Sequence, residues 1–307
     1  MVGVALIWGA ALPIIKYTLQ YLSPLVFLAY RLGISSLIAI LFLSIKRPNF
    51  SHATPRESMG LVLYSTFAVT ISLGMLFMGM KETSATLTGV IHALGPVITT
   101  IGGFLAFREK ITKSEGIGIT IAFIGTIVTV VTNLGGGTGD SFVLTGIELV
   151  ALGMLADGIS TLIARAMMKK GTLSAEAITH VSFLIGFLTL ILFVLYSMSL
   201  PSLLTAIAEA PIQAHLGVLY MAIFSGTIAY TMRNMASGLI EAGEVSVFTY
   251  IYPLISTPIS ILWLGESVNP WFIPGSILIA IGVTIAEYHK RKHQKLISAA
   301  IRGRKAR

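Results

Sequence analysis

The chain has 307 residues, of which 55% are hydrophobic and only 11% are charged, and its formal net charge is +8. Because soluble domains carry about 25% charged residues, a single water-soluble core cannot enclose this much apolar surface. The chain contains no cysteine, which excludes a disulfide framework and a thiolate metal site. The composition therefore predicts an integral membrane protein.

Ten apolar stretches approach the length of about 20 residues that a helix needs to cross the hydrocarbon core of a bilayer. A β-barrel would instead show shorter segments of alternating polarity, so we predict an all-α fold. The first stretch lacks the basic start and the cleavage site of a signal peptide, and we expect it to remain as a helix. The predicted transmembrane helices span residues 2–20, 25–45, 59–80, 84–106, 115–133, 143–167, 177–199, 212–236, 243–264 and 270–288.

The distribution of Lys and Arg predicts the orientation of these helices. Basic residues concentrate in the loops after the second, fourth and sixth helices, and eight of the 21 lie in the tail, residues 289–307. The loops after the first, fifth, seventh and ninth helices hold none, and Lys81 is the clear exception. The positive-inside rule then predicts that both termini lie in the cytoplasm. We expect the protein to lie in the cell membrane. We expect the tail to contact anionic lipid rather than nucleic acid.

An internal duplication is the most informative feature of the sequence. Residues 84–112 are repeated 157 positions later, and in each copy a proline, Pro96 or Pro253, interrupts an apolar run. A glutamate, Glu109 or Glu266, follows each proline at the same distance. Self-similarity at a fixed spacing indicates repeated structural units.

The two copies have opposite charge bias. Basic residues flank the first glutamate, Glu109, whereas none flank Glu266. The same unit therefore lies on opposite sides of the membrane, which predicts two inverted five-helix repeats with a substrate site near the midplane. We assign residues 1–133 to the first repeat, 134–142 to a Gly-rich connector and 143–288 to the second repeat.

Two five-helix halves, each containing this proline and glutamate pattern, resemble the EamA family of the drug/metabolite transporter superfamily. Trp8-Gly9 in the first helix and Arg31 in the second also match that family. The resemblance covers nearly the whole chain. It implies ten helices, alternating access and most often export of amino acids, metabolites or toxic small molecules. In the second half, Asp157-Gly158 stands where the first has Trp8-Gly9, and a buried acid is not expected of the family.

Asp157 and His92 are the candidates for proton coupling. Asp157 lies near the middle of the sixth predicted helix, where an ionised carboxylate costs about 3 kcal/mol and is expected to face the bundle interior or water. It can contact a substrate amine, carry a proton or form a structural ion pair. His92 lies one turn before Pro96 and can titrate near neutral pH. The alternative for His92 is a neutral imidazole bonded to a backbone carbonyl.

Other cavity candidates carry aromatic, thioether or amide groups. Aromatic side chains with a polar atom suit an amphipathic ligand, and methionines suit an adaptable cavity. Helix packing is the alternative for each of them. These substrate-binding candidates are Trp8, Met75, Met78, Tyr230, Asn234 and Tyr250, with Tyr252 in the same aromatic group.

Several residues are assigned structural roles. A proline inside a helix removes one backbone hydrogen bond and makes a kink or hinge. A glutamate at a loop end is expected to cap the helix that follows it. The residues in these two groups are Pro13, Pro96, Pro253, Glu109 and Glu266.

Two arginines inside helices are also assigned structural roles. Arg31 is expected to support the scaffold, with contact to a substrate carboxylate as the alternative. We expect Arg233, about one turn from the cytoplasmic end of its helix, to be an anchor that extends to the membrane surface rather than a gate.

These observations predict a secondary transporter of small organic solutes, most often an exporter of amino acids or related metabolites, with no cofactor or metal. A facilitated exchanger, an uptake carrier for another metabolite class and a non-transporting scaffold remain alternatives. An intramembrane enzyme would need catalytic groups at fixed spacing, such as HExxH or GxSxG, and neither pattern occurs.

Overall fold

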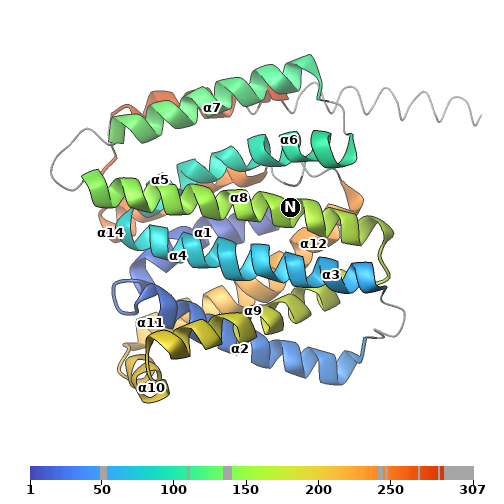
Figure 1. The fold of residues 1–307 in the computed structure, drawn as a ribbon. Coiled ribbons are helices and arrows are strands. Elements are labelled where there is room, and N and C mark those ends of the chain that lie inside the picture. The colour runs from blue at the N-terminus through green and yellow to red at the C-terminus, as the bar shows by residue number, and fades with distance from the viewer. Residues whose placement is uncertain are drawn as a thin grey trace, which may run out of the picture.

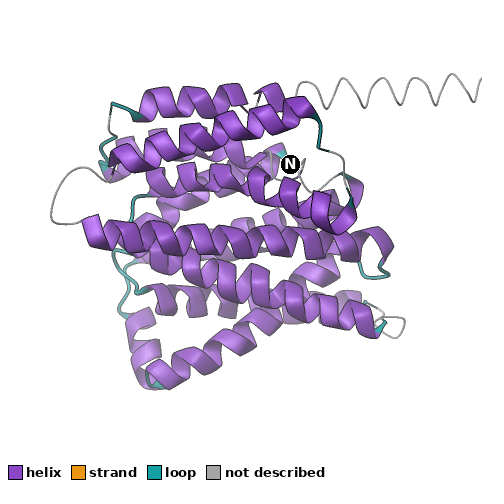
Figure 2. Ribbon diagram, turned by 45° about the horizontal axis from the view of Figure 1, so that its top comes forward, coloured by secondary structure: helices purple, strands orange, loops and turns teal. Residues whose placement is uncertain are grey.

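All regular structure that the computed structural model describes is helical (Figure 2). Glu109, most of the Gly-rich connector and the basic tail lie outside the described residues. The structure describes residues 1–48, 54–108, 111–133, 140–240, 245, 248–268, 270–282 and 284–286.

Most helices lie side by side along one direction of the molecule (Figure 1). Short π and 3₁₀ segments, labelled η, interrupt several of them. A further apolar helix spans Phe272–Ala286. The other elements are α1 (Val2–Thr18), α2 (Pro24–Lys46), α3 (Pro55–Tyr64), η1 (Ser65–Ile71), α4 (Ser72–Glu82), α5 (Ala85–Ile91), η2 (His92–Leu94), α6 (Gly95–Phe107), α7 (Lys113–Asn133), α8 (Asp140–Lys170), α9 (Ala175–Ser197), α10 (Leu200–Ala208), α11 (Ile212–Tyr220), η3 (Met221–Ile228), α12 (Ala229–Leu239), η4 (Phe248–Ile251) and α14 (Tyr252–Leu264).

Six helical stretches in the described residues are long and apolar enough to cross a membrane, and three shorter apolar helices accompany them. Their ends agree with the corresponding predicted helices to within about one turn, because the length of an apolar run sets the length of a span. The chain is therefore an all-helical membrane protein. The six stretches are Pro24–Lys46, Pro55–Glu82, Ala85–Phe107, Val143–Lys169, Ala175–Ser197 and Ile212–Leu239.

Two of these stretches contain π-helical segments that the sequence did not predict. η1 lies in the span Pro55–Glu82, and η3 lies in the span Ile212–Leu239. Tyr64 immediately precedes η1, and Tyr220 immediately precedes η3. A π segment inserts one residue into the α-helical register and is often found at functional sites.

The duplicated prolines interrupt their helices in the same way. Pro96 lies in the first turn of α6 directly after the 3₁₀ segment η2, and Pro253 lies in the first turn of α14 directly after η4. Proline has no N–H, so the normal α-helical bond is missing at this point. Each helix also ends in a left-handed residue, Arg108 with φ 55° and Gly265 with φ 66°. The repeated sequence thus has repeated backbone conformations.

One helix is missing from the prediction. The loop expected after the seventh predicted helix contains α10, whose N-terminus is capped by Ser199 Oγ, which accepts from the backbone N–H of Ser202. Leu203 is buried, while Leu200 and Leu204 are exposed. This helix is too short to cross a bilayer, so a search for long apolar runs does not find it.

Helices from the two predicted halves pack against each other: α8 along α4, α9 along α2 and α14 along α1. α4 and α8 approach closely at Gly79 and Gly146. A Cβ atom added to Gly79 would lie 2.7 Å from the Gly146 carbonyl oxygen and 2.8 Å from Val150. Small residues at such crossings let helix backbones approach within a membrane. Large apolar side chains cover the outside of the bundle, for example Leu41, Leu192 and Leu262.

Candidate functional site

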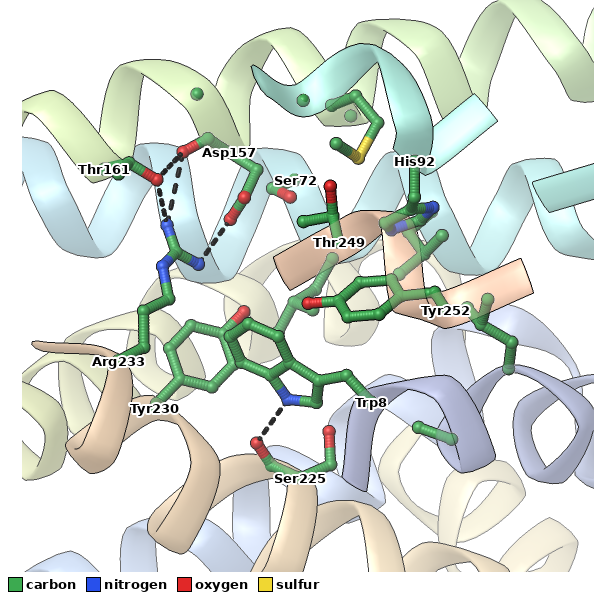
Figure 3. Close-up of a pocket in the computed structure, with 18 of the residues that line it drawn as sticks. Trp8, Ser72, His92, Asp157, Thr161, Ser225, Tyr230, Arg233, Thr249 and Tyr252 are labelled. Carbon is green, nitrogen blue, oxygen red and sulfur yellow. Dashed lines mark hydrogen bonds and ion pairs between the residues drawn. The ribbon is translucent and has the colours of Figure 1, made fainter. Parts of the chain in front are cut away.

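A cavity lies between helices of both predicted halves. Side chains from α1, α4, α8 and α12 line it, together with residues at the η2 and η4 interruptions (Figure 3). About 80 Å³ of it is open to the centres of water molecules, which is room for a few waters or part of a small solute. The polar and aromatic side chains of the lining are Trp8, Arg31, Ser72, His92, Thr99, Asp157, Thr161, Ser225, Tyr230, Arg233, Thr249 and Tyr252.

An ion pair joins the two sides of this cavity. Arg233 Nη1 of α12 donates to Asp157 Oδ1 of α8 at 2.7 Å. The Arg233 side chain is 3% exposed and the Asp157 side chain 25% exposed. A charge-assisted bond of this length is strong in a low-dielectric interior. The remaining exposure of Asp157 leaves part of its carboxylate facing the cavity.

The second terminal nitrogen of Arg233 has acceptors of its own. Nη2 donates to Ser160 Oγ at 3.0 Å, to Thr161 Oγ1 at 2.5 Å and to the backbone carbonyl of Asp157 at 3.3 Å. Acceptors on three residues within about one turn of α8 therefore fix the guanidinium against this helix (Figure 3). Arg233 is neutralised and positioned entirely by this protein.

Aromatic rings surround the ion pair. The Arg233 guanidinium carbon lies 5.5 Å from the centre of the Trp8 ring and 5.7 Å from that of Tyr230. Trp8 contacts Tyr230 edge-on at 5.1 Å and Tyr252 edge-on at 6.4 Å. Rings within about 6 Å of a cation stabilise its charge, and edge-to-face pairs hold one another in fixed orientations.

Two of these aromatic side chains bond to carbonyls of the π segments. Trp8 Nε1 donates to the Ser225 carbonyl in η3 at 3.0 Å, and Tyr230 Oη donates to the Ala68 carbonyl in η1 at 3.5 Å. Ser225 lies 157 positions after Ala68, the spacing of the duplication. A backbone carbonyl displaced from the α-helical pattern needs another donor inside a membrane. The two π segments thus position two rings of the cavity.

His92 lies at the η2 interruption and lines the cavity beside Tyr252, with ring centres 5.6 Å apart. Its Nδ1 is 2.8 Å from the Thr88 carbonyl oxygen. A carbonyl only accepts, so Nδ1 carries the proton in this bond. His92 therefore makes the bond to a backbone carbonyl that the structural alternative predicted. Its ring also lines the cavity.

Arg31 is the residue for which the sequence predicts a scaffold role, with contact to a substrate carboxylate as the alternative. It is fully buried in α2 and lines the cavity. None of its three guanidinium nitrogens has a hydrogen-bond partner in the described part of the chain. The Phe77 ring packs against the guanidinium, with its centre 5.6 Å from the guanidinium carbon.

Four of the predicted cavity residues are not among those that line it. Asn234 is fully buried, where it accepts from Tyr64 Oη at 2.9 Å and donates to Thr179 Oγ1 at 2.9 Å. Tyr250 packs in a separate apolar cluster. Met75 lies against α8 at Gly153. Met78 is partly buried elsewhere on α4.

The prediction that Arg233 extends to the membrane surface is wrong, because its side chain is buried in the ion pair with Asp157. Arg233 is the one Asp, Glu, Lys or Arg residue of the stretch Ile212–Leu239, and Asp157 lies in the middle of its helix, eight or more residues from Glu148 and Arg165. Such intramembrane charges commonly pair with one another, and this was the signal that could have joined them. Ser160, Thr161 and Thr249 gave no signal of their own.

Glu266 caps a helix, but not the one that follows it. Its carboxylate accepts from the backbone N–H groups of Ala85 at 2.7 Å and Thr86 at 3.0 Å. These groups open α5 in the other half of the chain, where a negative charge is favoured. The glutamate therefore connects the end of α14 to the start of α5.

A family model described as the EamA-like transporter family matches residues 1–131 and 144–287. The chain belongs to this family. The family match and the apolar helices both indicate a multi-pass membrane protein. The relatives that carry a functional name are transporters rather than enzymes. A solved crystal structure covers 94% of this chain and 97% of its own with a TM-score of 0.68 at 17% identity, which shows the shared fold.

Curated relatives of this EamA-like chain cover nearly its full length. The uncharacterized transporter YyaM of Bacillus subtilis is 25% identical over 288 residues, 93% of this chain and 92% of YyaM. An uncharacterized transporter of Archaeoglobus fulgidus is 26% identical over 281 residues, 91% of this chain and 94% of that protein. A protein of Salmonella typhimurium named a probable amino-acid metabolite efflux pump is 22% identical over 287 residues, 92% of this chain and 91% of its own.

Proposed function

We propose that this EamA-like protein is a secondary transporter that moves a small organic solute across the cell membrane by alternating access. Its two inverted five-helix halves would be residues 1–133 and 143–288, with residues 134–142 between them. Both termini would lie in the cytoplasm, where the basic tail meets anionic lipid. Rocking of such halves around a fixed midplane site is the usual mechanism for inverted repeats.

The observation that carries this proposal is the pairing of positions around the cavity. Residues 157 apart in the two halves line it together: Leu73 with Tyr230, Leu76 with Arg233, His92 with Thr249 and Gly95 with Tyr252. In α1 and α8 the spacing is 149 positions, and Trp8 pairs with Asp157 while Leu12 pairs with Thr161. A cavity formed by equivalent surfaces of two repeats is what a shared transport site requires.

The chemistry of the lining supports an organic solute with polar and apolar parts. Trp8, Tyr230 and Tyr252 offer ring faces, and Asp157 offers a partly exposed carboxylate. The relative named a probable amino-acid metabolite efflux pump supports amino acids or related metabolites as the cargo and export as the direction. Protonation of Asp157 or His92 would couple this movement to a proton gradient.

The duplicated prolines support a place for the movement itself. Each lies directly after a 3₁₀ segment whose residues line the cavity, His92 in η2 and Thr249 in η4. A helix interrupted at this point can bend without breaking regular hydrogen bonds. We therefore propose Pro96 and Pro253 as hinge positions, with Pro13 as a further kink in α1.

Flux measurements in proteoliposomes test the proposal. Purified protein would be assayed for uptake and efflux of pooled labelled amino acids, sugars and organic cations, with and without a pH gradient. Asp157→Asn removes the charge of the ion pair, and Thr120→Val removes a hydroxyl on α7 that bonds only within its own helix.

We expect selective flux of one solute class by wild type and by Thr120→Val, and at least about tenfold slower flux by Asp157→Asn. A pH gradient should drive wild-type flux if the proton is the coupling ion. No flux of any class, by a protein that thermal unfolding shows to be folded, would contradict transport. Flux that is equal in Asp157→Asn would remove Asp157 from the site.

A further inference from the structure

The cavity is lined by a second arginine, Arg31, whose charge has no partner among the described residues. The Arg31 side chain is 0% exposed, yet its Nε, Nη1 and Nη2 atoms have no acceptor in the described residues. Guanidinium carries five N–H donors and cannot lose its charge under physiological conditions. A buried charge in this state is costly unless something else enters to pair with it.

Arg31 and Arg233 line the same cavity, but their surroundings differ. Arg233 donates to the Asp157 carboxylate and to Ser160 and Thr161, so its hydrogen-bonding capacity is largely used. Among the described residues, Arg31 packs against the face of Phe77, which stabilises a cation but accepts none of its N–H bonds. Arg31 thus borders the cavity with a buried fork of N–H groups that has no acceptor among the described residues.

The charges of the lining favour an anion. Among the described residues of the lining, the charged side chains are Arg31, Arg233 and Asp157, which leave a net charge of one positive when His92 is neutral. Asp157 is already paired with Arg233. A guanidinium fork matches the two oxygens of a carboxylate, which can accept two parallel N–H bonds.

We propose that Arg31 binds the carboxylate of the transported solute and so selects small organic acids, including amino acids, over their neutral and cationic analogues. This assignment rests on the transport function proposed above. The rings of Trp8 and Tyr230 take the apolar remainder of the solute. Thr249 Oγ1, which is buried in the lining with no partner among the described residues, is placed to bind a second polar group of the solute.

The structural alternative is that Arg31 supports the fold, and Arg31→Met separates the two roles. Methionine fills a similar volume without charge, and replacing a buried unpaired charge by an apolar side chain need not destabilise a protein. If Arg31 is the carboxylate anchor, Arg31→Met folds and keeps its thermal stability, and its one defect is weaker binding of acids. Arg31→Lys keeps the charge and loses the fork, and serves as the second variant.

Thermal unfolding of the detergent-solubilised protein would be followed with phenylacetate, phenylacetamide and phenethylamine, and with leucine and leucinamide. Each set keeps the apolar part and changes the head group. Flux of the labelled compounds would be measured in proteoliposomes. Tyr220→Phe, which removes a hydroxyl bonded to the Ile7 carbonyl outside the cavity, is the matched control.

We expect wild type and Tyr220→Phe to be stabilised by the acids and not by the amine. Arg31→Met should bind the acids about 100-fold more weakly, the size of effect expected when one partner of a buried charge pair is removed. The affinity of Arg31→Lys for the acids should fall between those of wild type and Arg31→Met.

Wild-type flux or stabilisation confined to the amide or the amine would overturn the role of Arg31 while leaving the transport proposal standing. Acid binding by Arg31→Met that equals that of wild type would overturn it as well, and so would a loss of stability in Arg31→Met and Arg31→Lys without any ligand. Absence of flux for every head group, in folded wild type, contradicts the transport function itself.

Discussion

The two halves of the chain share their backbone conformations and differ in the side chains that line the cavity. A tyrosine precedes each π segment, a 3₁₀ segment precedes each duplicated proline, and a left-handed residue ends each of the two proline-containing helices. The prolines and the left-handed residues recur at the repeat spacing of 157 positions, and the two tyrosines are 156 positions apart. The shared backbone features of the two halves shape the cavity from both halves of the chain.

The chemistry of the cavity is not duplicated. Arg233 and Tyr230 correspond to Leu76 and Leu73 at the same depth in the other half, and Asp157 corresponds to Trp8. Two equivalent apolar surfaces would offer a polar solute nothing to bind, and two equivalent ion pairs would double the cost of buried charge. The repeat therefore supplies a symmetric framework, while one half supplies most of the charge.

Arg233 and its counterpart Leu76 give the sharpest contrast. Arg233→Met should lower the free energy of unfolding by about 3 kcal/mol, because the Asp157 carboxylate is left in the interior without its cation. Leu76→Met conserves volume and should cost less than about 1.5 kcal/mol. Denaturant or thermal unfolding in detergent measures both.

The double variant Arg233→Met with Asp157→Leu removes both charges and should recover most of the lost stability. Equal losses of stability for Arg233→Met and Leu76→Met would show that the ion pair adds nothing to stability beyond the packing of its side chains.

The helix ends and the proline interruptions were predictable, because apolar length and the missing N–H of proline act locally. The π segments were not, since they shift the register by one residue without a distinctive composition. The pairing of Arg233 with Asp157 requires the relative rotation of α12 and α8, which a single sequence does not contain.

Tyr230 and Asn234 show why helical spacing alone misplaced some cavity residues. Side chains four apart lie on one face of a helix, and this grouped the two residues. At about 100° per residue, however, Asn234 lies about 40° to one side of Tyr230 and Arg233 about 60° to the other. The cavity is on the Arg233 side, and Asn234 instead meets Tyr64 and Thr179.

Gly79 tests the close contact between the halves. Its counterpart in the repeat is Ala236, so one half carries the methyl group that the other excludes. Gly79→Ala should cost about 2 kcal/mol of stability, because the new Cβ would overlap the Gly146 carbonyl. Gly74 lies on the same helix with no atom within 4 Å of an added Cβ.

Gly74→Ala should therefore be neutral or slightly stabilising, because alanine is the better helix former by about 1 kcal/mol. Thermal unfolding of both variants in the same detergent makes the comparison. Similar losses for the two would mean that the glycines serve helix flexibility rather than close packing.

The two tyrosines that precede the π segments should differ in their contributions. Tyr64→Phe leaves the buried Asn234 Oδ1 without its donor at 2.9 Å, and should cost about 1.5 kcal/mol. Tyr220→Phe removes a donor from the Ile7 carbonyl, which lies within α1. That change should cost no more than about 0.5 kcal/mol, since the helix continues to supply a partner for this carbonyl. Unfolding midpoints in the reverse order would contradict this assignment of the two hydroxyls.

Glu266 tests the smallest difference, the cap that connects α14 of one half to α5 of the other. Glu266→Gln keeps the shape of the side chain, but its amide nitrogen cannot accept the second backbone N–H, so one of the bonds to Ala85 and Thr86 is lost. The expected cost is about 1 kcal/mol, the usual value of a helix N-terminal cap. Glu209→Gln is the control, because Glu209 is exposed at the C-terminal end of α10, where a negative charge gives no capping benefit. Both variants would be compared by thermal unfolding in low salt, and again in high salt. A loss for Glu266→Gln that persists in high salt identifies direct hydrogen bonding to α5, whereas a loss that disappears would identify a screened attraction to the helix end.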